Sequence, residues 1–574
     1  MGIPGFYTWL KTLCPKPFTR LLPGTKADTS SSPKQAFDHV LVDCNNMIHR
    51  AASSANTDVR VIRAFHQKLL MELRKNIIPT KSLFLAMDGP GPMAKIMEQR
   101  RRRVDSTNRM ERQTESAFAP ANFTPGCEFM NTMDNYLVNF AARAFAMDTF
   151  KPPLELTVSG SRLKLIQEAK HLLKTQEKGD TYCFVTADAD IIALSMASQL
   201  PVFIYKSQTQ EILDVSLLSK SIASKFPANA FPDRIARDFA LLTVFSGGDT
   251  IPKMRHVSIT SLWNTYVEFR QKHKDLYLST DGERGGISTK GLYTFCKLGI
   301  DENILMAHDP RTKERKSIEN SSGSNVQVDE WIKGMAWVLD GGLRGEHLDY
   351  SILYLGRAPT PTDVIKYLES TVGEGVISVK QQDEAVMAPD TRVPALTPEM
   401  CAASLLPARM QNLIPELYRP LLHEVDAELI RAGDDSVACA QVIHSIPSRP
   451  LPPDTSKVPG RLITVSGPRD DIKAHLNSWL PHIKGFSYLT DLSKFKVFYA
   501  TRYNNNSNKV GNLAHRKVNK EKVNSVGLKK KSKPHRESNK MAKAPTPSQP
   551  SVKKHHVAPM MLDRKPVEQT SLEA

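Results

Sequence analysis

Residues 40–43 read VLVD, residues 83–88 read LFLAMD and residues 183–190 read CFVTADAD. Each segment is an apolar, strand-like run that leads directly into one or more aspartates. From Met1 to about Pro252 such runs alternate with helical patterns, which predicts an α/β fold with a mixed or parallel sheet. Chemistry in an open α/β sheet gathers where the carboxyl ends of the strands emerge, so we expect these aspartates to lie close together.

Carboxylates placed side by side repel one another unless divalent cations neutralise them. A single aspartate after a strand is more often a helix cap, but several in one region favour bound cations. Oxygen ligands with no Cys or His nearby favour Mg²⁺ or Mn²⁺ over Zn²⁺, and a pair of ions about 4 Å apart promotes phosphodiester hydrolysis. The candidate catalytic and metal-binding residues are Asp43, Asp88, Glu168, Asp188, Asp190 and Asp249.

A basic segment, AKIMEQRRRR at residues 94–103, follows Asp88 closely. Four of its residues fall on one face of a helix and offer a charged fork for a terminal phosphate, namely Lys95, Gln99, Arg102 and Arg103. Arg100 and Arg101 are predicted to point elsewhere, and a solvated run of charge is the alternative interpretation. His49, on the predicted helix after Asp43, is a candidate for stacking on a base or for contacting phosphate. The alternative for His49 is a structural, partly buried histidine.

The net charge of +17 is unevenly distributed along the 574 residues. From Arg502 to the end, 17 Lys and Arg stand against 5 Asp and Glu, so this segment alone carries +12. The rest, with 60 basic and 55 acidic side chains, carries +5. A basic tail favours polyanions in a salt-dependent manner, although it is equally consistent with a solvated, disordered extension.

The seven cysteines form no CxxC pair and have no metal-ligand spacing with histidine, which argues against zinc and against a disulfide framework. The first residues lack the apolar region of a secretory signal, and no apolar run reaches membrane-spanning length. We therefore expect a soluble protein that makes no use of a membrane, in the cytoplasm. A nuclear location is the alternative, because KKKSKPH at 529–535 could be a nuclear signal.

Taken together, several segments resemble the Xrn family of 5′→3′ exoribonucleases, a branch of the PIN-like and flap-nuclease superfamily. The N-terminal segments are MGIPGFYTWL (1–10), DCNNMIH (43–49), AMDGPGPMAKIMEQRRRR (86–103), FTPGCEFM (123–130), TADADIIALSM (186–196) and SGGDTIP (246–252). WIKGMAWVL (331–339) and SLLPARMQNLIPELYRPLL (404–422) resemble the second conserved region of that family. Matching runs from residue 1 to about residue 425.

The resemblance implies that the six acids above match the metal ligands of the family, which would hold two Mg²⁺ or Mn²⁺ ions. It implies that Lys95, Gln99, Arg102 and Arg103 match the pocket for the 5′-monophosphate, that His49 matches a residue stacking on the first base, and that Lys170 is a substrate contact. The implied activity is processive hydrolysis of single-stranded RNA from a 5′-monophosphate end, releasing mononucleotides. The implied role is RNA degradation, in mRNA decay, by a monomer that decapping factors supply with ends.

Three departures from the family pattern are typical of a divergent member, as in a virus or another fast-evolving lineage. The family reads VPGEGEHK where this chain has LKLIQEAK (163–170), so Glu168 and Lys170 stay in register but Ile166 replaces the first glutamate. The family's GNDFLP is here GGDTIP, with the aspartate kept. Its stacking tryptophan has no counterpart in residues 346–359, where Tyr350 and Tyr354 are the candidates for compensation.

We expect four parts. Residues 1–252 would form the PIN-like nuclease domain, and residues 253–425 a mainly helical second region with an insertion near 310–327. Residues 426–500 would form a linker with a small, weakly defined region, and residues 501–574 a disordered basic tail.

Two other functions remain open. One is a flap- or structure-specific DNA nuclease of the same superfamily, although the residues after Asp249 contain no GxG hairpin. The other is a catalytically weakened RNA-binding scaffold, which Ile166 and the missing tryptophan would favour.

Overall fold

The computed structural model describes thirteen stretches of the chain: residues 5–21, 35–53, 55–110, 118–146, 154–159, 165–175, 177–227, 230–248, 250–305, 326–372, 385–433, 435–449 and 462–465. All of them belong to one compact unit, Met1–Tyr499. The second unit, Ala500–Ala574, contains the predicted basic tail and lies outside the described residues. Asp249 and most of the insertion expected near 310–327 also lie outside them.

The main sheet has eight strands in the order β1-β7-β6-β5-β2-β3-β4-β10. Its five central strands, from β6 to β4, are parallel, whereas β1, β7 and β10 pair antiparallel with their neighbours. The bounds are β1 (Phe18–Arg20), β2 (Gln35–Asp43), β3 (Ile77–Ala86), β4 (Glu155–Ser159), β5 (Tyr182–Val185), β6 (Val202–Lys206), β7 (Glu211–Asp214) and β10 (Leu462–Val465). This arrangement confirms the predicted α/β fold with a mixed sheet.

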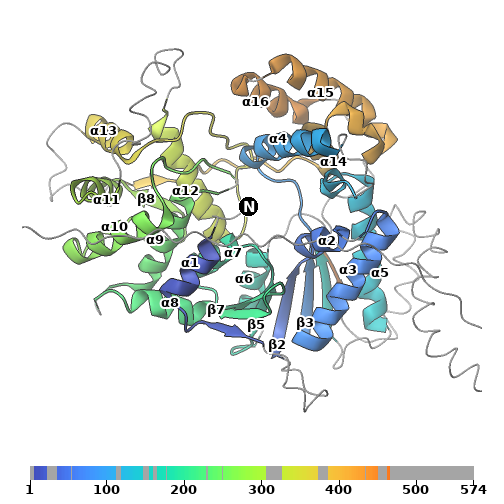
Figure 1. Cartoon of the computed structure of the whole chain (residues 1–574), viewed down its shortest axis with the longest axis horizontal. Coiled ribbons are helices and arrows are strands. Elements are labelled where there is room, and N and C mark those ends of the chain that lie inside the picture. Colours follow the sequence, from blue (N-terminus) through green and yellow to red (C-terminus); the bar gives the residue numbers. More distant parts are fainter. Residues whose placement is uncertain are drawn as a thin grey trace, which may run out of the picture. The chain divides into compact units, whose positions relative to one another are not determined.

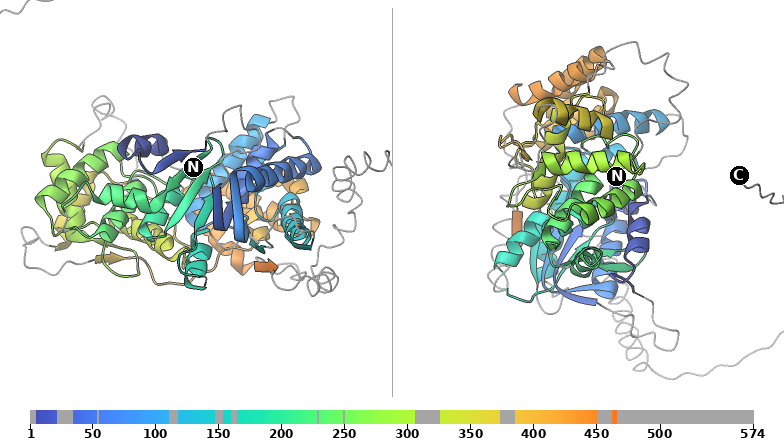
Figure 2. Two further views of the ribbon diagram at one scale, coloured as in Figure 1. Left: turned by 90° about the horizontal axis from the view of Figure 1, so that it is seen from below. Right: turned by 90° about the vertical axis from the view of Figure 1, so that its left-hand side faces the viewer.

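Helices cover both faces of the sheet, as Figures 1 and 2 show. The N-terminal helices are α1 (Phe6–Leu13), α2 (Cys44–Ala52), α3 (Asp58–Met71), η1 (Glu72–Asn76), α4 (Met93–Met110), η2 (Pro120–Phe123), α5 (Glu128–Ala146), α6 (Leu165–Thr175), α7 (Asp190–Ala197), α8 (Val215–Ala223) and α9 (Pro232–Phe245). The later elements are α10 (Ile259–Lys272), β8 (Gly286–Ser288), α11 (Thr289–Asp301), α12 (Val328–Arg344), α13 (Pro361–Val372), β9 (Ala385–Met387), α14 (Pro398–Leu405), η4 (Ala408–Leu413), η5 (Glu416–Tyr418), α15 (Arg419–Ala432), α16 (Ser436–Ser445) and η6 (Ile446–Ser448). Strands β8 and β9 form a separate two-stranded sheet.

Successive side chains of β2 point to opposite faces of the main sheet, and each face packs into a different hydrophobic core. Val40 and Val42 pack into a core shared with α2, α3, α5, α14 and α15. Leu41 points the other way, into a core shared with α1, α6 and α7 to α12. The first core therefore joins the main sheet to helices beyond residue 398, and the second joins it to helices that follow residue 232.

One expected helical pattern is broken in the structure. The apolar residues of 402–422 have helical spacing, which predicts one helix over this segment. In the structure α14 ends at Leu405 and α15 begins only at Arg419. Pro407 and Pro415 lie between them and restrict the residues before them to extended backbone. Short 3₁₀ turns, η4 and η5, fill the interval. Helix α15 also runs through the expected boundary at residue 425.

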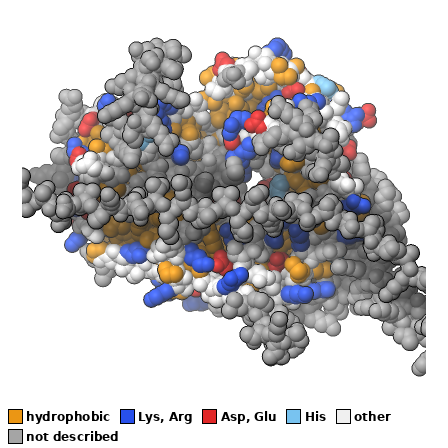
Figure 3. All heavy atoms as spheres, in the orientation of Figure 1, with side chains coloured by type: hydrophobic (Ala, Val, Ile, Leu, Met, Phe, Trp, Pro, Cys, Tyr) orange, Lys and Arg blue, Asp and Glu red, His pale blue; other side chains and the backbone are white. Residues whose placement is uncertain are grey.

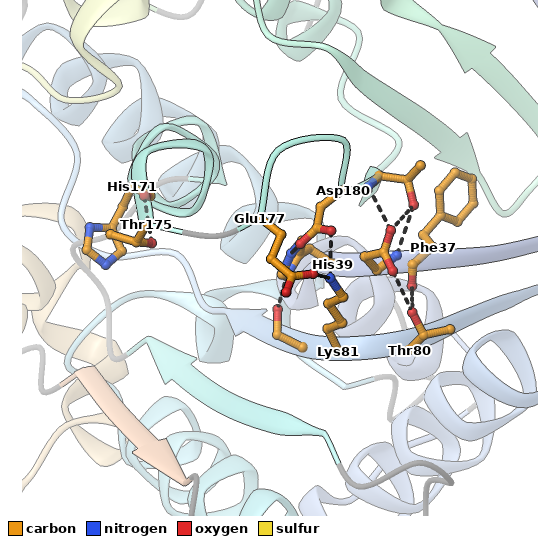
Figure 4. A network of polar contacts seen from close by, with 11 residues as sticks. Phe37, His39, Thr80, Lys81, His171, Thr175, Glu177 and Asp180 are labelled. Atoms are coloured by element: carbon orange, nitrogen blue, oxygen red, sulfur yellow. Dashed lines mark hydrogen bonds and ion pairs between the residues drawn. The ribbon is translucent and has the colours of Figure 1, made fainter.

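At the amino-terminal end of the central strands a buried polar network ties β2, β3 and the start of β5 together (Figure 4). The ring of His39 is hydrogen-bonded to the Ser82 hydroxyl at 2.7 Å and to the Asp180 carboxylate at 2.9 Å. Lys81 donates to Asp180 at 2.6 Å. The order Ser–His–Asp is that of a hydrolase triad, but His39 is only 1% exposed, so we assign this network a structural role.

Among the helices of the described residues, none is both long and apolar enough to span a bilayer.

Candidate functional site

The carboxyl ends of β2, β3 and β5 finish level with one another. In the parallel registers Asp43 lies opposite Ala86, and Val42 lies opposite Val185. The chain continues from these paired residues to Asp88 and Asp188 within two or three residues. We call Asp43, Asp88 and Asp188 the strand-end aspartates.

Asp43 is held rigidly where β2 passes into α2. It caps α2 by accepting a hydrogen bond from the backbone N–H of Asn46 at 3.3 Å. Its other oxygen accepts from the Thr186 hydroxyl at 2.9 Å. Desolvation, reinforced by the negative charges of Asp88 and Asp188, raises the pKa of Asp43 to about 7, although these two hydrogen bonds oppose the rise.

Asp88 and Asp188 are more exposed than Asp43 and are positioned through their backbones. The N–H of Asp88 donates to the side-chain oxygen of Asn45 at 3.0 Å. The N–H of Asp188 donates to the Thr186 hydroxyl at 3.1 Å, so Thr186 links this loop to Asp43. Asp190, the first residue of α7, donates its N–H to the Asp188 carboxylate at 3.1 Å.

The carboxylate oxygens of the strand-end aspartates are the kind of ligand that hard divalent cations prefer. Desolvation and the negative charges of Asp88 and Asp188 disfavour the charged state of Asp43, and a bound cation would offset these effects. As they stand, however, the described residues contain no group of three or more His, Cys, Asp or Glu side chains that could hold a metal ion. The set of metal ligands therefore stays a prediction.

Glu168 lies buried in the first turn of α6. Desolvation and the charge of Glu155 raise its pKa, whereas the charge of His171 lowers it. Ile166, at the position of the family's first glutamate, is a core residue at 3% exposure. The nearby Lys170 donates to the backbone carbonyl of Leu343 in α12, so it is engaged with the second region and not with α4.

The basic face of α4 consists of Lys95, Gln99, Arg102 and Arg103. Figure 3 shows Lys and Arg side chains, with acidic ones among them, in the area where α4 lies in Figure 1. Arg102 is braced by Glu98, which accepts from its Nε at 2.9 Å. Burial raises the pKa of the Cys401 thiol in α14, whereas the positive charges of Arg103 and Lys95 lower it, so both cations lie within electrostatic range of Cys401. Gln99 is partly buried beside them.

His49 links the aspartates to the basic face of α4. Its ring packs edge-on against Phe123 with 4.3 Å between ring centroids. Desolvation and the positive charge of Arg103 lower the pKa of His49, whereas the negative charge of Asp88 raises it. His49 therefore lies within electrostatic range of both halves of the candidate site, where a neutral ring is available for stacking on a base.

The two tyrosines considered as replacements for the stacking tryptophan differ in accessibility. Tyr354 is 9% exposed, belongs to the core, and donates its hydroxyl to the carbonyl of Arg357 at 2.7 Å. Tyr350 is only partly buried, and its backbone carbonyl accepts from the N–H of Met93 at the start of α4. Of the two, Tyr350 is the one that could reach a substrate.

Sequence reasoning missed Thr186, Asn45 and Phe123. Each lies inside a motif that had been recognised, TADAD, DCNNMIH and FTPGCEFM respectively. For Thr186 and Asn45 the signal was a position two residues from a predicted ligand, where hydrogen bonds that orient the ligands are expected. Phe123 lies far from His49 in the sequence, so no local signal pointed to their ring contact.

Comparison with known proteins agrees with these motifs. Residues 1–205 match the family model described as the XRN 5′-3′ exonuclease N-terminus. The chain is 24% identical over 373 residues to 5′-3′ exoribonuclease 1 of Saccharomyces cerevisiae, covering 56% of this chain and 23% of the yeast protein. It is 24% identical over 329 residues to 5′-3′ exoribonuclease 1 of Homo sapiens, covering 46% of this chain and 18% of the human protein.

Among solved structures, a catalytic core of Rad2 in complex with DNA substrate aligns over 64% of this chain and 95% of its own, with a TM-score of 0.32 and 13% identity. The chain spans about a quarter or less of the length of the yeast and human relatives. The matched residues 1–205 include the strand-end aspartates, His49, the basic face of α4 and the whole of helix α6. Residues 1–205 of this chain are thus similar to the N-terminal part of XRN 5′-3′ exonucleases.

Proposed function

We propose that this protein is a divalent-metal-dependent 5′→3′ exoribonuclease that degrades single-stranded RNA processively from a 5′-monophosphate end and releases mononucleotides. One observation carries the proposal: His49, the candidate stacking residue, lies within electrostatic range of both the Asp88 carboxylate and the Arg103 guanidinium of the basic face. A phosphodiester next to a charged terminal phosphate requires this combination.

In this proposal the basic face of α4 binds the terminal phosphate, and Arg102 and Arg103 supply the planar donors that match phosphate oxygens. His49 stacks on the first base and fixes the distance between the terminal phosphate and the scissile bond. The strand-end aspartates, with Glu168, Asp190 and Asp249, supply the ligands for Mg²⁺ or Mn²⁺. Bound divalent cations would activate the attacking water and stabilise the leaving oxygen.

End-labelled RNA tests this proposal directly. The full chain, incubated with Mg²⁺, should degrade 5′-monophosphate RNA and leave 5′-triphosphate RNA intact, and EDTA should stop the reaction. Equal survival of the two RNAs would refute the proposal. Faster cleavage of a flapped DNA than of linear RNA would replace it with a structure-specific DNA nuclease. The cytoplasmic location, the monomeric state and the supply of ends by decapping factors are proposed on the same basis.

A second candidate, RNA binding without cleavage, is favoured by one specific observation. Ile166 lies in the apolar core at the position where the family has an acid, so this chain has one carboxylate fewer there than the family pattern. Isothermal titration with Mn²⁺ separates the two candidates. Retained affinity for RNA without metal binding or cleavage would support the scaffold.

A further inference from the structure

Arg100 lies in the middle of the basic run but does not share the basic face of α4. Its guanidinium donates to the backbone carbonyls of Ser404 and Leu406, each at 3.2 Å, and pairs with the Asp426 carboxylate at 2.5 Å. The Arg100 and Asp426 side chains are only 13% and 7% exposed. Asp426 also accepts from the backbone N–H of Ala408 at 2.8 Å. One buried ion pair therefore joins α4 to the end of α14 and to α15.

The second region holds α4 at two further points. At its start, the N–H groups of Met93 and Ala94 donate to the carbonyls of Tyr350 and Ile352, at 2.8 and 3.1 Å. These groups would otherwise need another partner at a helix N-terminus. Along its length, α4 packs against α14. In Figure 1, α4, α14 and α15 lie together in one group.

Three anchors of this kind fix both the axis and the rotation of α4. Rotation matters because neighbouring residues of a helix point about 100° apart, so a small turn about the axis moves Arg102 and Arg103 away from a bound phosphate. The carbonyl and carboxylate contacts of Arg100 are directional and buried, and therefore resist such a turn. An isolated helix with four consecutive arginines would have no comparable restraint.

We propose that Arg100 and Asp426 form a positioning pair that sets the orientation of the phosphate-binding face of α4, so that residues 398–426 act on recognition of the RNA 5′ end without touching it. This inference rests on the proposed function. It assigns Arg100 a role different from that of Arg102 and Arg103, its neighbours in the same basic run. Loss of the pair weakens discrimination of the terminal phosphate while the strand-end aspartates are left in place.

The test compares Arg100→Ala, Arg100→Lys and Arg449→Ala in the full chain. Arg449 is the matched control, because it is equally buried at 11% exposure and pairs with Glu424 and Glu428 of the same helix α15. None of its ion pairs involves α4. Two quantities are measured: the ratio of kcat/KM for 5′-monophosphate over 5′-hydroxyl RNA, and hydrogen exchange of residues 93–105 without RNA.

We expect Arg100→Ala to lower the ratio about tenfold, mainly through a higher KM for 5′-monophosphate RNA, and to speed the exchange of α4. Arg100→Lys, which keeps the charge but loses the planar fork, should fall between Arg100→Ala and wild type. Arg449→Ala should change the ratio less than twofold and leave the exchange of α4 unaltered. Asp426→Asn should repeat the effect if Arg100→Ala fails to fold.

Two outcomes would overturn the inference: an unchanged ratio in Arg100→Ala and Asp426→Asn, or an equal fall in Arg449→Ala. A wild-type chain with no preference for the monophosphate would instead overturn the proposed function. In that case, faster exchange of α4 in Arg100→Ala alone would still support the positioning of the helix.

Discussion

At the scale of one residue, Asp43 shows how the fold shifts the pKa of a carboxyl group at the end of a strand. Two hydrogen bonds hold its carboxylate in place, and desolvation with two neighbouring negative charges raises its pKa to about 7. A carboxylate in this setting favours its neutral form. A bound proton or a bound cation would each offset the repulsion at this point of the fold.

Replacing Asp188 tests the proposed metal site. The side chain is exposed and accepts one hydrogen bond from the Asp190 N–H, so Asp188→Ala should fold normally. Metal-held charge stabilisation is worth several kcal/mol, and about 1.4 kcal/mol corresponds to a factor of ten in rate. Cleavage of 5′-monophosphate RNA should therefore fall at least a hundredfold, with the melting temperature unchanged. Wild-type cleavage by this variant would remove Asp188 from the site.

Asp134 in α5 provides a pH test of stability. Burial raises the pKa of Asp134 to about 6, above its ordinary value of 3.8, so the folded state binds its proton more tightly than the unfolded state. The stability that the neutral form contributes is present below pH 3.8 and is lost as the pH rises through 6.

Asp134→Asn removes this titration. The variant should be more stable than wild type at pH 8 by about 1–3 kcal/mol, and the gain should vanish towards pH 4. Thermal unfolding of both proteins across this pH range measures the difference. A gain that is constant with pH would show that Asp134 titrates normally.

At the scale of elements, the structure shows what sequence periodicity can and cannot locate. The spacing of Lys95, Gln99, Arg102 and Arg103 identifies one face of α4, because that face is a local property of the helix. The partner of Arg100 is Asp426, more than 300 residues away, and periodicity contains no information about such a pairing. Sequence analysis could therefore separate Arg100 from the basic face but could not say what it contacts.

The same limit applies to α6. The strand ends at Asp43, Asp88 and Asp188 were predictable because an apolar run into an aspartate is a local pattern. The placement of Glu168 was not, because it depends on how α6 packs against the end of α12. At that contact Gln167 donates to Glu346 at 3.2 Å. Similarly, the helix expected through 402–422 was wrong because Pro407 and Pro415 interrupt an otherwise helical spacing.

Gly126 tests how closely two elements approach. It lies in the FTPGC turn with φ of +90°, and an added Cβ would lie 2.1 Å from the backbone oxygen of Pro398 at the start of α14. Gly126→Ala should therefore destabilise the protein strongly, by more than the roughly 1–2 kcal/mol that left-handed backbone alone costs.

Gly179→Ala is the matched control. Its φ is +106°, but nothing lies within 4 Å of an added Cβ, so it incurs only the backbone cost. Thermal unfolding of both variants isolates the contribution of the contact between the turn and α14. Equal shifts in melting temperature would mean that the turn and α14 can move apart to make room for the added Cβ without loss of stability.

At the scale of the whole molecule, charge is divided between a nearly neutral body and a basic C-terminal segment, which carries +12 of the total of +17. Removing residues 500–574 leaves the compact unit Met1–Tyr499 intact. The truncated protein should keep its turnover of short RNA but bind long single-stranded RNA more weakly and with less dependence on salt. Each lost phosphate contact lowers the salt slope by about 0.7.

Binding is best measured in the Asp188→Ala background, so that RNA is not consumed, between low and high KCl. An unchanged slope would show that the basic segment does not contact RNA.

The last strand of the main sheet has a consequence for how the protein is made. β10 (Leu462–Val465) pairs antiparallel with β4 (Glu155–Ser159), so the outer border of the sheet waits for a segment synthesised some 300 residues later. Until the ribosome has passed residue 465, β4 presents unpaired backbone groups that a neighbouring nascent chain could capture. Early termination before β10 would thus leave the outer edge of β4 exposed and able to pair with another chain.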